Sequence, residues 1–340
     1  MMYWWMVPAV ALFSLLMTGL LRHYALRQSI LDIPNDRSSH TVPTPRGGGM
    51  AILVSFLLAL PVLIHAGHME WPFALAMIGA TIIVGVVGFV DDHGGVPARY
   101  RLLVHFVAAG WVMFWLGALP PLIIFGVEME LGRLGYLFTA LYLVWLLNLY
   151  NFMDGIDGLA GVEAMSACLA GALLFVLHGY WSHALLAVVL AASVSGFLFW
   201  NFPPARIFMG DAGSGFLGIA LGVMSLQAGW LVQPMLWAWV IMLGVFIVDA
   251  TVTLLVRFYR REKLSEGHRT HAYQIASRRW GGHRPVTLGV LAINGFWLLP
   301  IALVVGLGYV SGAIGVIVAY VPLVVVAVRL GAGQPERPAS

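Results

Sequence analysis

The sequence is poor in charged residues. Asp, Glu, Lys and Arg make up only 10% of its 340 residues, whereas a soluble domain carries about 25%. The single cysteine, Cys168, stands in an apolar run, which excludes an intrachain disulfide and a cysteine-histidine metal cluster. The shortage of charge excludes a soluble protein of this length, and we expect no nucleic-acid partner.

Long apolar runs take the place of charge. Hydrophobic residues make up 61% of the chain, in runs near the ~20 residues that cross a bilayer as a helix. Positive charge follows the first run, at Arg22, so we interpret that run as a transmembrane helix and not as a cleaved signal peptide. The pattern predicts an all-α polytopic membrane protein with eleven transmembrane helices, at 2–21, 49–66, 72–90, 102–118, 135–150, 159–178, 183–201, 213–230, 234–256, 287–307 and 310–328.

The basic residues set the predicted orientation. An odd number of spans puts the termini on opposite sides, and the positive-inside rule puts the N-terminus outside and the C-terminus in the cytoplasm. Of the 18 Lys and Arg residues, only Arg133 then lies outside. We expect one transmembrane domain over 1–330, a cytoplasmic tail over 331–340, and five cytoplasmic loops at 22–48, 91–101, 151–158, 202–212 and 257–286.

One outer connection, 119–134, is longer than the others. Ile123, Phe125 and Val127 alternate there with Gly126 and Glu128. A period of two is typical of a β-strand, so this segment is either a small hairpin or an ordinary loop.

The unusual polar residues gather in the predicted cytoplasmic loops. In the first loop, Arg46 and Gly47 follow two prolines and precede more glycine. Exposed backbone amides at a helix start suit phosphate oxygens. A helix-entry loop without a ligand would have the same sequence pattern. In the second loop, Asp91 and Asp92 are adjacent carboxylates followed by Arg101, which indicates neutralisation by a cation or a basic group, or a solvated helix end.

The third loop carries the strongest signal. Asn151, Asp154 and Asp157 repeat every three residues, so a helical turn would place them on one stripe, with Asn148 just before. No basic residue lies between Arg133 and Arg206 to pair with them. Oxygen ligands without a cation partner favour a hard divalent ion.

Two further loops follow. Phe208 and Asp211 come after Arg206 in a glycine-rich stretch, which indicates either a site for a metal-bound phosphate group or a helix cap at Asp211. The last loop contains His268, Arg269 and His271, which suit a diphosphate, and an interfacial helix is expected from 271 to 280.

One acid lies inside a predicted span. Asp249 is costly at that depth and therefore a functional candidate. It could also serve a structural role by holding an arginine of the last loop.

Five acids from three of these loops map to one membrane face: Asp91, Asp92, Asp154, Asp157 and Asp211. Carboxylate and amide oxygens select Mg²⁺, or Mn²⁺, over zinc, and Mg²⁺ binds through few protein carboxylates plus substrate phosphates. The residues thus indicate phosphoryl transfer at a membrane surface, with a lipid as one substrate. A lipid-phosphate transporter is the main alternative outside enzymes, but it needs ionisable residues along a transmembrane path.

In sequence order, the motifs resemble those of the polyprenyl-phosphate N-acetylhexosamine-1-phosphate transferase superfamily, and most of all the WbpL-like and WecA-like enzymes that initiate O-antigen synthesis. The related phospho-MurNAc-pentapeptide transferase carries three consecutive histidines in its last loop. This chain has only His268 and His271 there, separated by Arg269 and Thr270. The motifs that carry the resemblance are Pro43-Thr-Pro-Arg-Gly-Gly-Gly, Val90-Asp-Asp, Asn151-Phe-Met-Asp-Gly-Ile-Asp-Gly-Leu, Phe208-Met-Gly-Asp-Ala-Gly-Ser and His268-Arg-Thr-His.

The resemblance implies a Mg²⁺-dependent enzyme of the bacterial inner membrane, with a periplasmic N-terminus and an active site facing the cytoplasm. Its substrates would be a UDP-N-acetylhexosamine and undecaprenyl phosphate, with UMP as leaving group. Whether the protein forms a homodimer is open. The implied roles are metal binding for Asp211 and Asn151, catalysis for Asp91, Asp92, Asp154, Asp157, His268 and His271, and substrate binding for Arg46, Gly47, Arg101, Asn148, Phe208 and Arg269.

Overall fold

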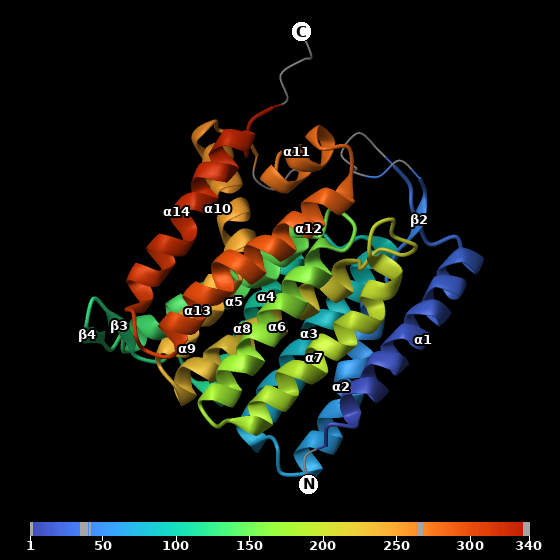
Figure 1. Ribbon diagram of the computed structural model, residues 1–340. Helices are drawn as coiled ribbons and strands as arrows, with labels where there is room; N and C mark the ends of the chain where they lie inside the picture. The colour runs from blue at the N-terminus through green and yellow to red at the C-terminus, as the bar shows by residue number, and fades with distance from the viewer. Residues whose placement is uncertain (1–2, 35–39, 41, 264–267, 336–340) are drawn as a thin grey trace.

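The computed structural model describes residues 3–34, 40, 42–263 and 268–335. It is a helical bundle with two small two-stranded sheets (Figure 1). The helices are α1 (Met6–Arg27), α2 (Gly49–His65), α3 (Trp71–Gly94), α4 (Ala98–Leu116), α5 (Arg133–Met153), α6 (Leu159–Leu177), α7 (Trp181–Asn201), α8 (Asp211–Leu231), α9 (Pro234–Met242), α10 (Gly244–Tyr259), α11 (Ala272–Arg279), α12 (His283–Ile293), the π-helical turn η1 (Asn294–Leu298), α13 (Leu299–Gly306) and α14 (Gly312–Leu330).

Every predicted span is helical, which confirms the all-α class, but two spans are interrupted. The ninth consists of α9 and α10, bent by 69° at their junction, and the tenth contains η1 between α12 and α13. Among the described residues, eight helical segments are long and apolar enough to cross a membrane, or nine if the bent pair is one span. Eleven crossings and their orientation therefore stay predictions. Two of the basic residues predicted to lie on the cytoplasmic side, Arg37 and Arg337, are outside the described residues.

A buried acid that the sequence did not single out lies beside the bend. Glu163 of α6 is fully buried and accepts a hydrogen bond from Asn294 Nδ2 at 2.7 Å. The backbone N–H of Phe246, in the first turn of α10, faces the same carboxyl group. Glu163 therefore links α6 to η1 next to the start of α10.

Small residues let the central helices approach closely. A Cβ atom on Gly88 of α3 would lie 2.5 Å from the Cα of Ala212 in α8, and one on Gly49 of α2 would lie 2.4 Å from the Cα of Gly213. Membrane helices commonly associate through such contacts. The approach brings the C-terminal end of α3, with Asp92, against the start of α8.

We therefore expect Gly88→Ala to lower the free energy of unfolding by about 1–3 kcal/mol, because the added methyl meets backbone that has no free space. Gly110→Ala in α4 is the control, since nothing lies within 4 Å of its Cβ position and alanine is the better helix former. Thermal unfolding in detergent would test the pair. Equal melting temperatures for the two variants would contradict the tight contact.

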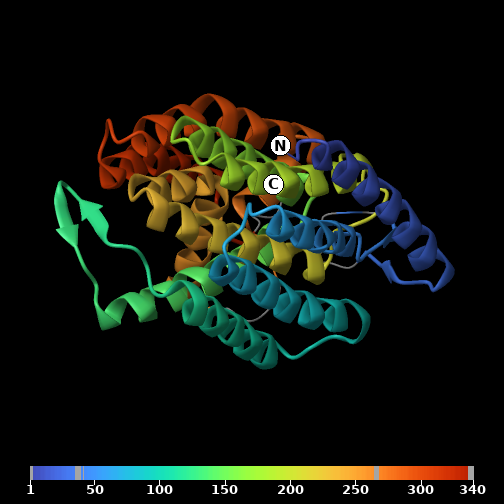
Figure 2. The ribbon, with the colours of Figure 1, turned by 90° about the horizontal axis from the view of Figure 1, so that it is seen from below.

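The hairpin interpretation of 119–134 is confirmed. Strands β3 (Leu122–Ile124) and β4 (Val127–Met129) pair antiparallel, with Ile123 opposite Glu128. The hairpin projects from the side of the bundle in Figure 2, with β3 in contact with α14. A second pair, β1 (Leu31–Asp32) and β2 (Thr44–Pro45), lies near the far end of α1. The first turn of α1 and the last turn of α14 lie at opposite ends of the bundle.

Candidate active site

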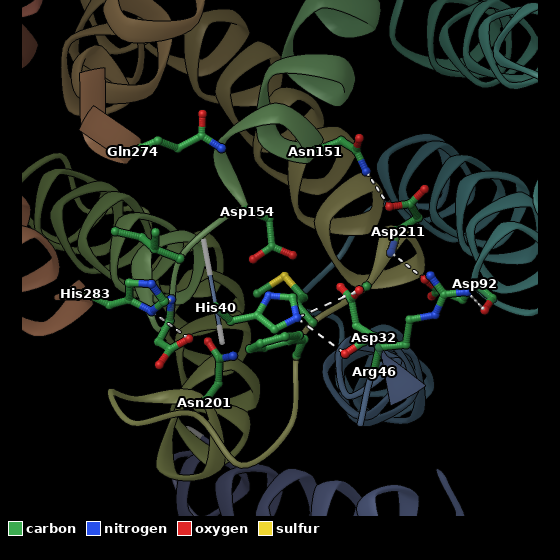
Figure 3. A pocket seen from close by; sticks show the side chains of 16 residues that line it. Asp32, His40, Arg46, Asp92, Asn151, Asp154, Asn201, Asp211, Gln274 and His283 are labelled. Atoms are coloured by element: carbon green, nitrogen blue, oxygen red, sulfur yellow. Dashed lines mark hydrogen bonds and ion pairs between the residues drawn. The ribbon is translucent and has the colours of Figure 1, made fainter. Parts of the chain in front are cut away.

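A cavity of about 310 Å³ opens where the predicted loops meet. Its walls come from stretches of chain more than 200 residues apart, and Figure 3 shows the side chains that point into it. The predicted convergence of these loops is therefore confirmed. The lining residues are Asp32, His40, Arg46, Asp92, Asn151, Asp154, Gly155, Ile156, Asp157, Asn201, Phe208, Met209, Gly210, Asp211, Gln274 and His283.

Asp211 is the hub of the polar contacts. Asn151 Nδ2 donates to its Oδ1 at 2.7 Å, and Arg101 Nη1 donates to its Oδ2 at 2.7 Å. The same Arg101 nitrogen donates to Asp91 Oδ2 at 2.5 Å. The two residues predicted to bind metal are thus in direct contact, and one guanidinium bridges two of the predicted carboxylates.

Asp92 holds the start of α8. Its side-chain oxygens accept hydrogen bonds from the backbone N–H groups of Asp211, at 2.9 Å, and Ala212, at 3.3 Å. Arg46 Nη2 donates to the Asp92 carbonyl oxygen at 2.5 Å. The helix cap that the sequence suggested at Asp211 is therefore supplied by Asp92, and Gly210, with φ at +79°, is the residue before the helix.

Asp92→Ala should lower the free energy of unfolding by about 1–2 kcal/mol, as loss of a capping side chain does. Asp92→Asn, which keeps one acceptor oxygen, should fall between this variant and wild type. Chemical denaturation in detergent measures both. Equal stability of all three proteins would show that the capping bonds contribute nothing.

Asp154 projects into the cavity without a hydrogen-bond partner among the described residues (Figure 3). It follows the last residue of α5. Burial raises the pKa of this carboxyl well above its usual range, and the nearby carboxylates of Asp211, Asp92 and Asp157 raise it further. The cavity therefore disfavours the charged form of this carboxyl unless a cation lies beside it.

Asp157 is fixed by groups that the sequence analysis did not single out. Its Oδ1 lies 3.0 Å from His283 Nδ1, and its Oδ2 accepts the Ala205 N–H at 2.9 Å. The same His283 nitrogen lies 3.3 Å from the Asp157 backbone nitrogen. Its contact with the carboxylate is the shorter of the two, as expected if Nδ1 carries the proton and donates it to Oδ1. Thr287 Oγ1 donates to the Asp157 carbonyl at 2.8 Å, so α12 holds this turn in place.

The predicted His268, Arg269 and His271 are not among the residues that line the cavity. His271 is buried, and its Nδ1 lies 3.2 Å from Asp249 Oδ1. His268 stacks on the His271 ring with centroids 4.9 Å apart. Burial, and then the positive charges of His271 and Arg257, lower the pKa of His268 to about 3, so this imidazole is neutral at pH 7.

Asp249 supports α11, and the suggestion that it holds an arginine is wrong. It accepts the backbone N–H groups of Ala272 and Tyr273, both at 2.9 Å. Tyr273 Oη in turn donates to the Phe152 carbonyl at 2.9 Å. Through these contacts α11 presents Gln274 to the cavity, and the predicted helix over 271–280 is confirmed.

The remaining predicted substrate-binding residues lie around the cavity. Phe208 lines it, and its ring packs edge-on against His40 with centroids 4.8 Å apart. Gly47, with φ at +93°, lies in a small neighbouring pocket that Arg46 shares. Asn148 lies behind Asn151 in another small pocket, 3.4 Å from His105 Nδ1.

Five cavity residues with polar side chains were not predicted from the sequence as individual site residues. Asp32 and His40 lay in a loop that was considered only as a segment, and His283 was one of many basic residues in the last loop. Asn201 and Gln274 carried no signal beyond being polar beside an apolar run. The five are Asp32, His40, Asn201, Gln274 and His283.

The described residues contain no group of three His, Cys, Asp or Glu side chains arranged to enclose a metal. The donors fit Mg²⁺ nonetheless, because this ion uses one or two carboxylates together with substrate phosphates and water. Asp211 supplies a carboxylate, Asn151 an amide oxygen, and Asp154 an unpartnered charge in the same cavity.

Comparisons with known proteins agree with the motifs. Residues 74–229 match glycosyl transferase family 4. The chain is 30% identical over 293 residues to a probable undecaprenyl-phosphate N-acetylglucosaminyl 1-phosphate transferase of Bacillus subtilis, covering 82% of this chain and 78% of that protein. It is 27% identical to the phospho-N-acetylmuramoyl-pentapeptide-transferase of Streptococcus thermophilus, covering 77% and 82%.

A third relative is the decaprenyl-phosphate N-acetylglucosaminephosphotransferase of Mycobacterium tuberculosis, which is 30% identical over 64% of this chain and 58% of its own length. All three relatives are named as transferases of a phosphosugar, two of them with a polyprenyl phosphate in the name. The chain belongs to glycosyl transferase family 4, within the polyprenyl-phosphate hexosamine-1-phosphate transferase superfamily.

Proposed function

We propose that this protein transfers N-acetylhexosamine-1-phosphate from a UDP-sugar to undecaprenyl phosphate, with release of UMP, as the first step of O-antigen synthesis. The observation that supports it most is the convergence of Asn151, Asp154 and Asp211 on one cavity at the end of the bundle. The site would face the cytoplasm at the bacterial inner membrane, where both a nucleotide sugar and a lipid phosphate can reach it.

The proposed reaction is a single displacement. An oxygen of the acceptor phosphate attacks the sugar-bound phosphorus of the UDP-sugar, and the bond from that phosphorus to the oxygen of UMP breaks. A phosphomonoester has a second pKa near ~6, so most of the acceptor is already dianionic at neutral pH and needs no general base. The main obstacle is repulsion between the two phosphate groups.

The described residues address that repulsion by position and charge. Asp211 and Asn151 would hold Mg²⁺ or Mn²⁺, which supplies charge neutralisation at the diphosphate when bound. Arg101, which lies beside Asp91 and Asp211, would attract the acceptor phosphate. Phe208 and Asp157 would contact the nucleotide, with Asp157 oriented by His283.

Two alternative functions can be distinguished from the proposed one. The phospho-MurNAc-pentapeptide transferase reaction is disfavoured because the last loop lacks three consecutive histidines. A lipid-phosphate transporter would need ionisable groups along a transmembrane path, whereas the five acids that line the cavity gather at one end of the bundle.

The test is UMP release by purified protein from a panel of UDP-sugars, with undecaprenyl phosphate and Mg²⁺, and with EDTA as control. We expect release from a UDP-N-acetylhexosamine only when both undecaprenyl phosphate and Mg²⁺ are present. Activity with UDP-MurNAc-pentapeptide alone would favour the peptidoglycan reaction. The absence of UMP release from every donor would refute the enzyme assignment.

A further inference from the structure

Two arginines distant in sequence meet on one tryptophan, outside the cavity. The Arg22 guanidinium of α1 lies 5.8 Å from the ring centroid of Trp200 in α7, and that of Arg206 lies 5.7 Å from the same ring. Arg22 Nε also donates to the Arg206 carbonyl oxygen at 3.2 Å. The sequence analysis placed Arg206 near a metal-bound phosphate group, but Arg206 does not line the cavity.

This arrangement holds two positive charges together without an acid. Among the described residues, neither Arg22 nor Arg206 forms an ion pair with a carboxylate. Contact with an aromatic face offsets part of the repulsion, yet two neighbouring guanidinium groups still favour an anion between them. Guanidinium groups bind phosphate, as they bind carboxylate, through paired N–H donors.

The surroundings indicate that the phosphate belongs to a lipid. Trp200 packs over Gly19 of α1, and its Nε1 donates to the Leu15 carbonyl at 3.0 Å. Leu16 and Leu20 of α1 and Phe199 of α7 are each more than half exposed next to it. Tryptophan is enriched at the membrane interface. An apolar strip that ends at a pair of arginines matches an amphiphile with an anionic head.

The position agrees with this reading. Arg206 follows Ala205, whose N–H is bonded to the cavity residue Asp157, so the site lies at the same end of the bundle as the cavity. By the predicted orientation, that end faces the leaflet rich in anionic lipid. We propose that Arg22, Trp200 and Arg206 form a binding site for the headgroup phosphate of an anionic phospholipid, wedged between α1 and α7.

The test is lipid retention by the purified protein, measured by native mass spectrometry after exposure to phosphatidylglycerol or phosphatidylcholine. Two basic side chains near an anionic lipid strengthen binding by about thirtyfold. We therefore expect R22Q/R206Q to hold phosphatidylglycerol about thirtyfold more weakly than wild type, with retention of phosphatidylcholine unchanged. This measurement does not depend on the proposed reaction.

The matched control is R279Q/R284Q, which removes the same charge from exposed arginines in the last loop. If both double variants lose phosphatidylglycerol equally, general attraction to positive charge explains the binding and the site is refuted. A second measurement adds inorganic phosphate to the protein loaded with phosphatidylglycerol. Displacement of phosphatidylglycerol by millimolar phosphate would show a free-anion site and overturn the lipid assignment.

Discussion

Asparagine in place of Asp154 is expected to lower the rate of sugar-phosphate transfer by about a thousandfold. The carboxylate points into the cavity and has no hydrogen-bond partner among the described residues, so its charge serves whatever binds there. Loss of one preorganised electrostatic group in an active site costs about 10²–10³ in rate. UMP release at saturating donor and Mg²⁺ measures the effect.

The same substitution should leave the protein folded, and without Mg²⁺ more stable at neutral pH. Because the pKa of Asp154 is raised in the folded protein, the folded state keeps a proton that the unfolded chain has released. Stability therefore falls as the pH rises from about 4 towards the raised pKa. Asp154→Asn removes this part of the pH dependence, and so would a bound cation in the wild type.

Glu128→Gln is the matched control, since Glu128 lies exposed on the β4 strand, away from the cavity. It should leave both the rate and the pH dependence of melting as in wild type. Transfer by Asp154→Asn within tenfold of the wild-type rate would show that this carboxylate is not part of the reaction site.

The helices could be predicted from the sequence because each apolar run is a local property of the chain. The hairpin tip was also local, since Gly126 lies between two short alternating stretches. The bend at the junction of α9 and α10 was not predictable in this way. The run there is continuous, and the buried acid beside the bend, Glu163, belongs to a different helix.

The cavity could be predicted in outline for a related reason. Polar residues close in sequence, such as Asn151, Asp154 and Asp157, indicate a site by their spacing. Partnerships across the fold leave no such pattern. Asp92 bonds to the amides of α8 from 119 residues away, and His283 reaches Asp157 across a similar distance in sequence. His268 and His271 show the converse, since they form a polar motif in the sequence but do not line the cavity.

Asp249→Ala is expected to give the largest loss of stability, about 3–5 kcal/mol. The Asp249 side chain is buried and accepts hydrogen bonds from the backbone N–H groups of Ala272 and Tyr273 and from Thr253 Oγ1, with His271 Nδ1 beside it. Removing one partner of a buried charged pair costs about this much, because the other groups stay buried without their acceptor. Thermal and chemical unfolding in detergent would measure it.

The same change should also weaken donor binding, because α11 carries Gln274 into the cavity. We expect KM for the UDP-sugar to rise about tenfold or more, with a smaller effect on kcat at a temperature where the variant is folded. The matched control is Glu128→Ala, which removes an exposed acid of the β4 strand and should cost about 0.5 kcal/mol or less. If both variants were destabilised equally, the hydrogen bonds of Asp249 would contribute no more to stability than a surface acid does. Packing alone would then hold α11 in place.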